Sequence, residues 1–439
     1  MLAQTFPKDK VKLYDRLQPP PAPTDEAWSD VARFYLIGLG SRGQSALAKF
    51  GLLEEVTKYG VFCVGRKDWA PDAEEGTIRI FEERKVQTLV LPRDKLVGIL
   101  HQHILDNYSD RIELNYGFEI EPLSFGDGID QAQSRIMTLE RRIAQLEAQL
   151  ATKLPSQTIV PPAPSFIGRL DKIIVRASQC APTAGGDLTS SEAKTALAEA
   201  QEVLSHTEKS TVVSSKLLIA ADGNVRTIAN AIQKRDEIKY RDMNPVKRLF
   251  SGPPFKVRGF IDDNKRIYKT IPLRMPDDWP KRLNYSARSK GSRIVFDAFP
   301  ANLNGDYCGV ILLRESDSLA KEDSDPAELR EVLDAVLPDF SALIDDSVLA
   351  MVAKKPPSYL PAFRYIGPRL HEGDKTILIG DCAHTLKPYF GLGANSALED
   401  VKVSYISTHQ LELTVSVWRS VLIATLPDAL ETLYVGYRC

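Results

Sequence analysis

Near its C-terminal end the chain reads Thr376-Ile377-Leu378-Ile379-Gly380-Asp381-Cys382-Ala383-His384. The short apolar run over 376–379 is typical of a fully buried strand that ends at Gly380. In open α/β sheets, ligands bind beyond the carboxyl ends of the strands. The sequence therefore predicts that Asp381 stands at such an edge, where its carboxylate can accept hydrogen bonds from the hydroxyl groups of a ligand.

A tight turn and a helix are predicted directly after this strand. Pro388, Gly391 and Gly393 favour a turn that brings backbone N–H groups close to a ligand. The helix is predicted to start near Ala394, and the positive end of its dipole favours an anion. The Asp-Cys-Ala-His segment alone favours a helix entry capped by Asp381. The full run through residue 395 is more specific for a ligand site.

The composition sets the broad class of protein. The chain has 439 residues, of which 43% are hydrophobic and 26% charged, and this is ordinary for a soluble globular protein of two or three domains. The net charge of -2 argues against nucleic acid as a partner. The five cysteines are scattered and form no CxxC, so neither a disulfide framework nor a metal site is expected. No apolar run is long enough to predict a transmembrane helix, and the N-terminus has no secretory signal.

Local patterns predict further elements along the chain. Short strands are expected at 33–38 and 61–64, and helices from Gln44 to about Tyr59 and from Arg93 onwards. A strand is expected over 211–220, running into Ala221-Asp222-Gly223. Four short β-runs between residues 255 and 314 predict a mostly antiparallel sheet. Asp325-Pro326 predicts the start of another helix.

Residues 129–210 differ in character from their surroundings. Apolar residues repeat at the spacing of a coiled-coil seam, namely Ile136, Leu139, Ile143, Leu146 and Leu150. Several prolines follow, and a second helix is predicted from Ser190 to His206. The pattern favours a helical and proline-rich insertion. Self-association through 131–150 is the alternative, although two heptads are few for that role.

A glycine-rich segment matches a dinucleotide fingerprint. Gly38-Leu39-Gly40-Ser41-Arg42-Gly43 has the form GxGxxG between a predicted strand and a predicted helix. The next strand is followed by Arg66, a basic residue of the kind that meets the 2′-phosphate of NADP. An NADP-binding βαβ unit is therefore one hypothesis. It is weakened by Gly51, which lies inside the predicted helix.

The run over 376–400 resembles a motif of the FAD-dependent aromatic hydroxylases, the class A flavoprotein monooxygenases, in particular their kynurenine 3-monooxygenase-like branch of plant and algal type. The motif has the form GDAxHxxxPxxGxGxN, and its positions here are Gly380, Asp381, Ala383, His384, Pro388, Gly391, Gly393 and Asn395. The family also has an Asp-Gly motif after a strand, which Asp222-Gly223 matches. Ala229 stands where that motif usually ends in arginine. The resemblance covers roughly 8–126 and 211–405.

The resemblance implies that FAD is the cofactor. Asp381 is then expected at the ribityl chain, and Gly393, Ala394 and Asn395 at the pyrimidine edge of the flavin. Asp222 and Gly223 would lie near the flavin. The remaining expected cofactor residues of the Gly-Asp motif are Gly380, Pro388 and Gly391.

The resemblance extends into the N-terminal part of the chain. Val11–Arg16 resembles the second strand of the FAD-binding unit, with Asp15 at the adenosine ribose, and Arg93 is expected at the ribityl–pyrophosphate part of FAD. On this interpretation the GxGxxG of 38–43 is accidental. The first strand and the true fingerprint would lie upstream of Met1, so the sequence is expected to be N-terminally incomplete. Arg66 falls where kynurenine hydroxylases hold the substrate carboxylate, although a surface arginine would fit equally well.

The expected fold is α/β, with a Rossmann-like FAD-binding domain that lacks its first βα unit and is interleaved with a mostly antiparallel substrate domain. The FAD-binding domain is expected over 1–60, 86–128, 211–235 and 366–408. The substrate domain is expected over 61–85 and 236–365. The insertion over 129–210 and a tail over 409–439 lie outside both.

The resemblance implies the activity of a monooxygenase. NADPH or NADH would reduce FAD, and O2 would form a C4a-hydroperoxyflavin that hydroxylates a small aromatic substrate. Two alternatives remain, namely an NADP-dependent reductase that uses Gly38–Gly43 and a non-catalytic remnant that no longer binds FAD. The sequence indicates a soluble protein but leaves the compartment, the substrate and the oligomeric state open.

Overall fold

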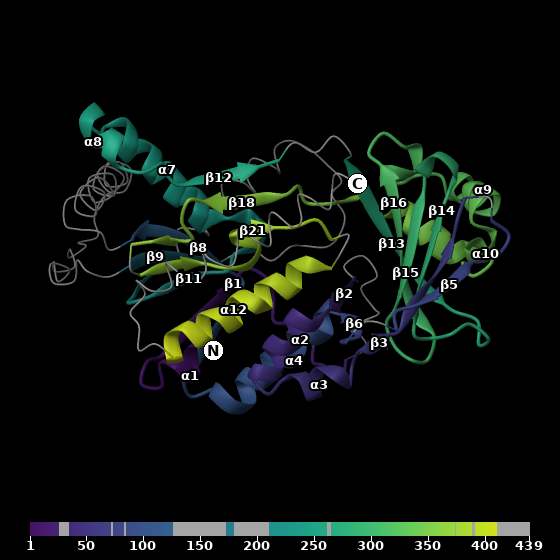
Figure 1. The fold of residues 1–439 in the computed structure, drawn as a ribbon, viewed down its shortest axis with the longest axis horizontal. Coiled ribbons are helices and arrows are strands. Elements are labelled where there is room, and N and C mark those ends of the chain that lie inside the picture. The colour runs from purple at the N-terminus through teal and green to yellow at the C-terminus, as the bar shows by residue number, and fades with distance from the viewer. Residues whose placement is uncertain are drawn as a thin grey trace, which may run out of the picture.

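The computed structural model describes residues 1–25, 35–71, 73–82, 85–125, 173–179, 210–260, 265–373, 375–388 and 391–410. Figure 1 shows a large antiparallel sheet at one end of the molecule and the long helix α12 (Leu392–Gln410) outside it, in the larger remaining part. Several small sheets surround α12. No helix of the described ranges is long and apolar enough to cross a membrane.

The large sheet has seven strands in the order β17-β13-β16-β15-β14-β4-β5. Their bounds are β17 (Ser358–Tyr359), β13 (Arg266–Arg274), β16 (Asp306–Arg314), β15 (Val295–Pro300), β14 (Leu283–Arg288), β4 (Gly65–Trp69) and β5 (Thr77–Ile80). β4 pairs with β14 in parallel, and the other neighbours are antiparallel. The mostly antiparallel sheet predicted from residues 255–314 is confirmed, and it also recruits β4 and β5 from much earlier in the chain.

One face of this sheet is covered by helices α9 (Pro326–Val336), α10 (Pro338–Ser341) and α11 (Asp346–Lys354). Strand residues such as Phe296 and Tyr307 pack there against Leu333 and Phe340 in one hydrophobic core. The predicted start of α9 is confirmed, because Pro326 is its first residue and Asp325 accepts a hydrogen bond from the N–H of Ala327 at 2.8 Å.

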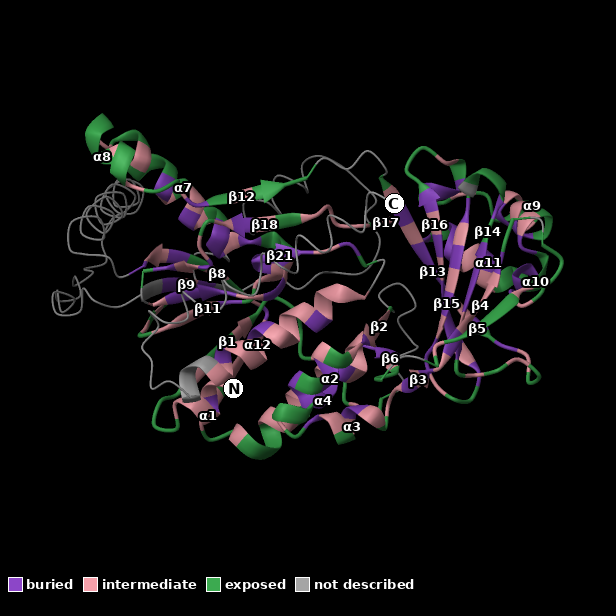
Figure 2. Ribbon diagram, viewed as in Figure 1, coloured by how far each residue is buried: buried purple, intermediate pink, exposed green. Residues whose placement is uncertain are grey.

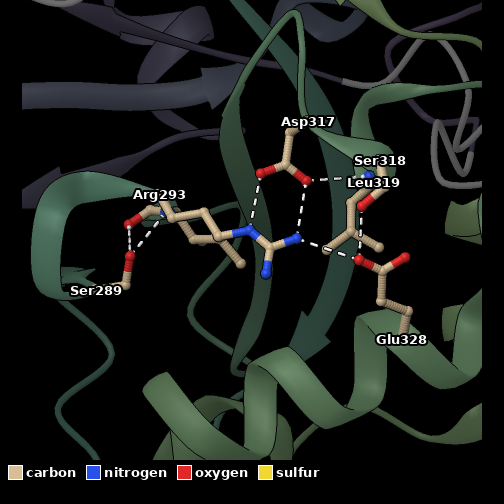
Figure 3. A network of polar contacts seen from close by, with 7 residues as sticks. Ser289, Arg293, Asp317, Ser318, Leu319 and Glu328 are labelled. Atoms are coloured by element: carbon tan, nitrogen blue, oxygen red, sulfur yellow. Dashed lines mark hydrogen bonds and ion pairs between the residues drawn. The ribbon is translucent and has the colours of Figure 1, made fainter.

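A polar network fastens α9 to the neighbouring loops (Figure 3). Arg293 donates to both carboxylate oxygens of Asp317, at 2.8 and 3.1 Å, and to Glu328 of α9 at 3.2 Å. These hydrogen bonds raise the pKa of Arg293 above its ordinary value. The network lies on the helical layer of the large sheet.

Two pairs of parallel strands form the Rossmann-like part. β1 (Val11–Asp15) pairs with β7 (Ile112–Tyr116), and β11 (Leu218–Ala220) pairs with β20 (Thr376–Leu378). β19 (His371–Glu372) adds an antiparallel strand to β20. All three residues of β20 are buried, as predicted for its apolar run.

Two further antiparallel sheets lie beside these pairs, in the orders β10-β9-β8 and β12-β18-β21. Their bounds are β8 (Phe118–Ser124), β9 (Ile173–Gln179), β10 (Ser210–Ser215), β12 (Lys256–Gly259), β18 (Arg364–Gly367) and β21 (His384–Thr385). Two predictions are corrected here. β9 is a strand inside the segment predicted to be helical and proline-rich, and the strand predicted over 211–220 is two strands that belong to different sheets.

The third small sheet has the order β2-β6-β3, made of β2 (Leu36–Leu39), β6 (Thr88–Pro92) and β3 (Val61–Cys63). It packs with α2 (Ser41–Lys49), α3 (Leu53–Thr57) and α4 (Arg93–Tyr108) around a second core. The single helix predicted from Gln44 to Tyr59 is wrong. Gly51 adopts a positive φ of 73° between α2 and α3 and breaks it.

The remaining described helices are α1 (Leu2–Thr5), α7 (Thr227–Arg241) and α8 (Pro245–Phe250). Short 3-10 turns are η2 (Gly223–Val225), η3 (Lys290–Ser292), η4 (Ser318–Ala320) and η5 (Gly380–Cys382). Figure 2 shows α8 largely exposed, while the inner strands of the large sheet are largely buried and its edge strand β5 is exposed. The coiled-coil seam of 131–150, the helix of 190–206 and the tail after residue 410 lie outside the described residues.

Candidate functional site

Two carboxylates follow neighbouring parallel strands at the same edge. Leu218 lies opposite Thr376 and Ala220 opposite Leu378, so β11 and β20 end together. Asp222 follows β11, and Asp381 follows β20. The predicted position of Asp381 at a carboxyl edge is confirmed, and Asp222 joins it there.

Asp381 is half-buried, and its carboxylate accepts no hydrogen bond from the described residues. Burial raises its pKa, while the charges of His384 and Arg226 lower it. One carboxylate oxygen lies 3.7 Å from where a Cβ on Gly393 would stand. The Asp381 carboxylate therefore lies beside the start of α12, and its oxygens can accept hydrogen bonds from a ligand.

The predicted turn and helix after this strand are present. Gly391 has a positive φ of 61°, and α12 begins at Leu392, so Gly393 and Ala394 belong to its first turn. Pro388 is exposed. Gly380 also has a positive φ, of 64°, at the entry to η5. The backbone N–H groups of the first turn have no partners within the helix and can bind a ligand.

Asn395 acts differently from the predicted ligand contact. Its side-chain oxygen accepts hydrogen bonds from the N–H groups of Gly40 at 2.8 Å and Gly43 at 3.2 Å. Its amide nitrogen donates to the carbonyl oxygens of Gly38 at 2.8 Å and Gly391 at 2.5 Å. The buried side chain therefore fastens the start of α12 to the β2–α2 segment, and only its backbone remains free to contact a ligand.

The NADP hypothesis for Gly38–Gly43 is not supported by this geometry. In a dinucleotide-binding βαβ unit, the two strands run parallel and lie close together in one sheet. Here β6 lies between β2 and β3 and pairs with both in the antiparallel sense, so β2, α2 and β3 do not form such a unit. Asn395 already occupies the N–H groups that would hold a pyrophosphate. The segment follows a strand and precedes a helix as predicted, but its glycines make room for a side chain of this protein.

Arg93 opens α4. Its guanidinium stands 5.6 Å from the ring of Tyr35, and it contacts Asp94 at 3.4 Å. Arg93 and Asp381 are both close enough to Tyr35 for their charges to act on its hydroxyl. The structure thus brings these two predicted residues to one region.

Asp15 and Gly223 lie at strand ends as well. Asp15 is the last residue of β1, is exposed, and accepts a hydrogen bond from the N–H of Leu17 at 2.9 Å. Gly223 has a positive φ of 63°. Asp222 accepts a hydrogen bond from the N–H of Ile228 at 3.1 Å, in the first turn of α7.

Arg66 lies on β4, where it alternates with Trp69 of the helix-covered core and so projects from the other face of the large sheet. On that face, Leu36 of β2 and Val310 of β16 pack against a small core made of Ala301 and Cys308. Arg66 is already paired, because its Nε donates to Asp68 at 2.6 Å. Burial raises the pKa of the nearby Asp297, while its hydrogen bond with Ser286 and the charge of Arg66 lower it.

Three features of the site were missed from the sequence. His384 contacts Asp400 of α12 at 2.8 Å, and the same oxygen of Asp400 accepts from the N–H of Gly380 at 2.8 Å. Exposed Tyr35 lies within reach of the charges of both Arg93 and Asp381. Buried Arg226 binds the backbone of the Gly-Asp loop, residues 380–385. Arg226 and His384 stand inside the two motifs, so the motifs were the only signal that could have found them.

The fold is similar to that of solved oxygenases and monooxygenases. The structure of 2-methyl-3-hydroxypyridine-5-carboxylic acid oxygenase aligns over 100% of this chain and 87% of its own, with a TM-score of 0.58 and 13% identity. That of p-nitrophenol 4-monooxygenase from Pseudomonas putida aligns over 96% and 79%, with a TM-score of 0.54 and 13% identity.

The sequence comparisons lead to kynurenine 3-monooxygenases. Kynurenine 3-monooxygenase 2 of Aspergillus niger is 31% identical over 192 residues, which cover 43% of this chain and 35% of the relative. The chain spans about a third or less of the length of the curated relatives it matches. No family model matches the chain. Fold and sequence together support the relationship with the FAD-dependent aromatic hydroxylases that the motifs indicate.

Proposed function

We propose that the chain binds FAD at the carboxyl ends of β11 and β20 and hydroxylates a small aromatic substrate with O2 and NADPH or NADH. The observation that carries the proposal is the half-buried carboxylate of Asp381, which accepts no hydrogen bond from the described residues and lies beside the first turn of α12. A carboxylate next to free backbone N–H groups fits a cofactor that carries both hydroxyl groups and an electron-rich ring edge.

Each residue would have a distinct task when FAD is bound. Asp381 would accept hydrogen bonds from the ribityl hydroxyls, and the N–H groups of Gly393 and Ala394 would donate to the pyrimidine edge. Asp15 and Arg93 would contact the adenosine ribose and the ribityl–pyrophosphate part. Arg66 would bind a substrate carboxylate, after its pairing with Asp68 is loosened.

The bound flavin would supply the oxygen-transfer chemistry. The overall reaction would consume one NAD(P)H, one proton and one O2, and would yield NAD(P)⁺, water and the hydroxylated ring. The protein residues would bind and orient the reactants and exclude water. The face of the large sheet that carries Arg66 would form the substrate side, since Leu36 of β2 packs there against the small core of Ala301 and Cys308.

The test is FAD binding by the full chain. The purified protein should show the visible absorption of oxidised flavin, or regain it when incubated with FAD. Asp381→Ala should weaken FAD binding about tenfold or more, because a hydrogen bond to a charged group contributes about 1.5–3 kcal/mol. Asp110→Ala, at an exposed aspartate, is the matched control and should bind like the wild type.

The outcomes separate the alternatives. Flavin that is bound and is reduced anaerobically by NADPH or NADH supports the monooxygenase. Protein that binds NADPH but no flavin would favour a reductase. Protein that binds neither would indicate a non-catalytic remnant and would overturn the proposal.

A further inference from the structure

Arg226 is the largest of the fully buried side chains, with 1% of its surface exposed. It stands between η2 and α7, and its backbone has a positive φ of 58°, a conformation that residues with a side chain rarely adopt. A long cationic side chain is costly to bury unless its donors are satisfied. The position therefore demands a specific set of partners.

The guanidinium of Arg226 makes five hydrogen bonds. Nε donates to the carbonyl oxygen of Cys382 at 3.2 Å, and Nη2 donates to that of Asp381 at 2.6 Å and to the hydroxyl of Thr385. Nη1 donates to the carbonyl and side-chain oxygens of Asn224, at 3.2 and 2.6 Å. Arginine has five N–H donors, so the whole fork is used within the protein.

These bonds join two loops that are 156 residues apart in the chain. On one side is the Asp-Gly loop, which begins at Asp222 and runs to Arg226. In it, the Asp222 side chain also accepts a hydrogen bond from the N–H of Ile228 at 3.1 Å. On the other is the Gly-Asp loop, in which Thr385 donates to the carbonyl of Asp381 at 2.9 Å. Because the Asp381 carbonyl is bound by Arg226, the orientation of this residue is constrained, and its carboxylate stands beside Gly393.

We propose that Arg226 is a positioning residue for the candidate flavin site, which holds the Gly-Asp loop so that the Asp381 carboxylate faces the ligand. The inference rests on the proposed function for the identity of the ligand. It assigns no catalytic contact to Arg226, whose donors are all spent on the protein. Arg226 thereby couples the Asp-Gly and Gly-Asp loops into one unit.

The first test needs no cofactor. Amide hydrogen exchange of the ligand-free protein should accelerate at residues 380–385 in Arg226→Met, with less change in Arg226→Lys, because lysine keeps the charge but loses the planar fork. Arg330→Met is the matched control. Arg330 also binds carbonyl oxygens, those of Ser341 and Ile344, but in the helical layer of the large sheet. Unchanged exchange at 380–385 in Arg226→Met would overturn the proposal.

The second test measures FAD affinity of the full chain. Arg226→Met should bind FAD at least tenfold more weakly than the wild type, Arg226→Lys should recover part of the loss, and Arg330→Met should bind normally. If Arg226→Met does not fold, Thr385→Val can replace it, because it removes one acceptor of the Arg226 guanidinium. This variant should show a smaller loss of FAD affinity.

The failures of the two proposals are distinguishable. A wild type that binds FAD with an equally tight Arg226→Met would overturn the role of Arg226 alone. A wild type that binds no FAD would overturn the proposed function and, with it, the assignment of Arg226 to a flavin site. Weak binding in Arg330→Met equal to that in Arg226→Met would also count against the proposal, since both losses would then reflect general destabilisation.

Discussion

The side-chain oxygen of Asn395 accepts a hydrogen bond from the backbone N–H of Gly40 at 2.8 Å. The same oxygen accepts from Gly43 at 3.2 Å, so one amide side chain satisfies donors at the start of α2 that a phosphate would otherwise bind. Residues 355 positions apart thereby form one joint between α2 and α12. The glycines of this segment serve a packing contact.

Alanine substitutions of Gly40 and Gly43 should have unequal effects. A Cβ on Gly43 would stand 2.5 Å from the Asn395 oxygen, whereas one on Gly40 would stand 3.9 Å away. Gly43→Ala should lower the free energy of unfolding by about 2 kcal/mol, because overpacking outweighs the gain in helix propensity. Gly40→Ala should stay within about 1 kcal/mol of the wild type.

Urea denaturation of the two variants checks this order. A dinucleotide fingerprint would behave differently, since the backbone at the second glycine approaches the pyrophosphate. Gly40→Ala with normal stability and a large loss of NADPH binding would therefore contradict our interpretation of the segment.

The stability of the protein should depend on both the hydrogen bonds that the Asn395 side chain accepts and those that it donates. Asn395→Ala leaves two N–H groups and two carbonyl oxygens without this partner, and should cost about 3 kcal/mol of unfolding free energy. Asn395→Asp keeps the acceptor but cannot donate to Gly38 and Gly391, and should cost less. Thermal and urea unfolding measure both, with Asn107→Ala, at an exposed position of α4, as the control. Equal losses in the two Asn395 variants would show that the acceptor contributes little.

Local patterns predicted those parts of the fold whose signals are local. The apolar run before Gly380, the proline after Asp325 and the β-runs of 255–314 each identify an element from neighbouring residues. Strand β9 was missed, although Ile173-Ile174-Val175 is a β-branched run, because a helical and proline-rich composition surrounds it.

The joints of the candidate site could not be predicted in the same way. Arg226 finds its carbonyl partners 155 and 156 residues away, and Asn395 finds Gly38 at 357. The periodicity of a sequence cannot predict such distant pairs, since they depend on how the parallel strands and helices pack together. The motifs placed Asp381 and the turn before α12, while only the structure shows what holds them.

Arg66 and Asp68 provide a test of the substrate side. Asp68→Asn should free the guanidinium and raise affinity for benzoate by up to about fivefold, since an ion pair of this exposure contributes about 1 kcal/mol or less. Affinity for the neutral analogue benzamide should not change, and Arg66→Gln should weaken benzoate alone. Calorimetric titration of the FAD-reconstituted wild type and both variants with each ligand measures these affinities. Parallel changes for benzoate and benzamide would exclude Arg66 as a carboxylate ligand.

The buried pair of His384 and Asp400 should make stability depend on pH. Burial lowers the pKa of His384, but the hydrogen bond and charge of Asp400 outweigh burial and raise it above the ordinary 6.5. Since the folded protein holds this proton more tightly than the unfolded chain, the contribution is complete below about pH 6.5 and is lost as pH rises through the folded pKa.

Unfolding free energies of the wild type and of His384→Asn should therefore converge as the pH is raised from 6 to 9. At pH 6, Asp400→Asn should cost about 3 kcal/mol, because it leaves a buried imidazolium without its counter-charge. Asn107→Ala, at an exposed position of α4 that does not titrate, should keep a constant offset from the wild type. A His384→Asn curve that runs parallel to the wild type over this range would mean that folding leaves the pKa of His384 unchanged, and would contradict a pKa raised by Asp400.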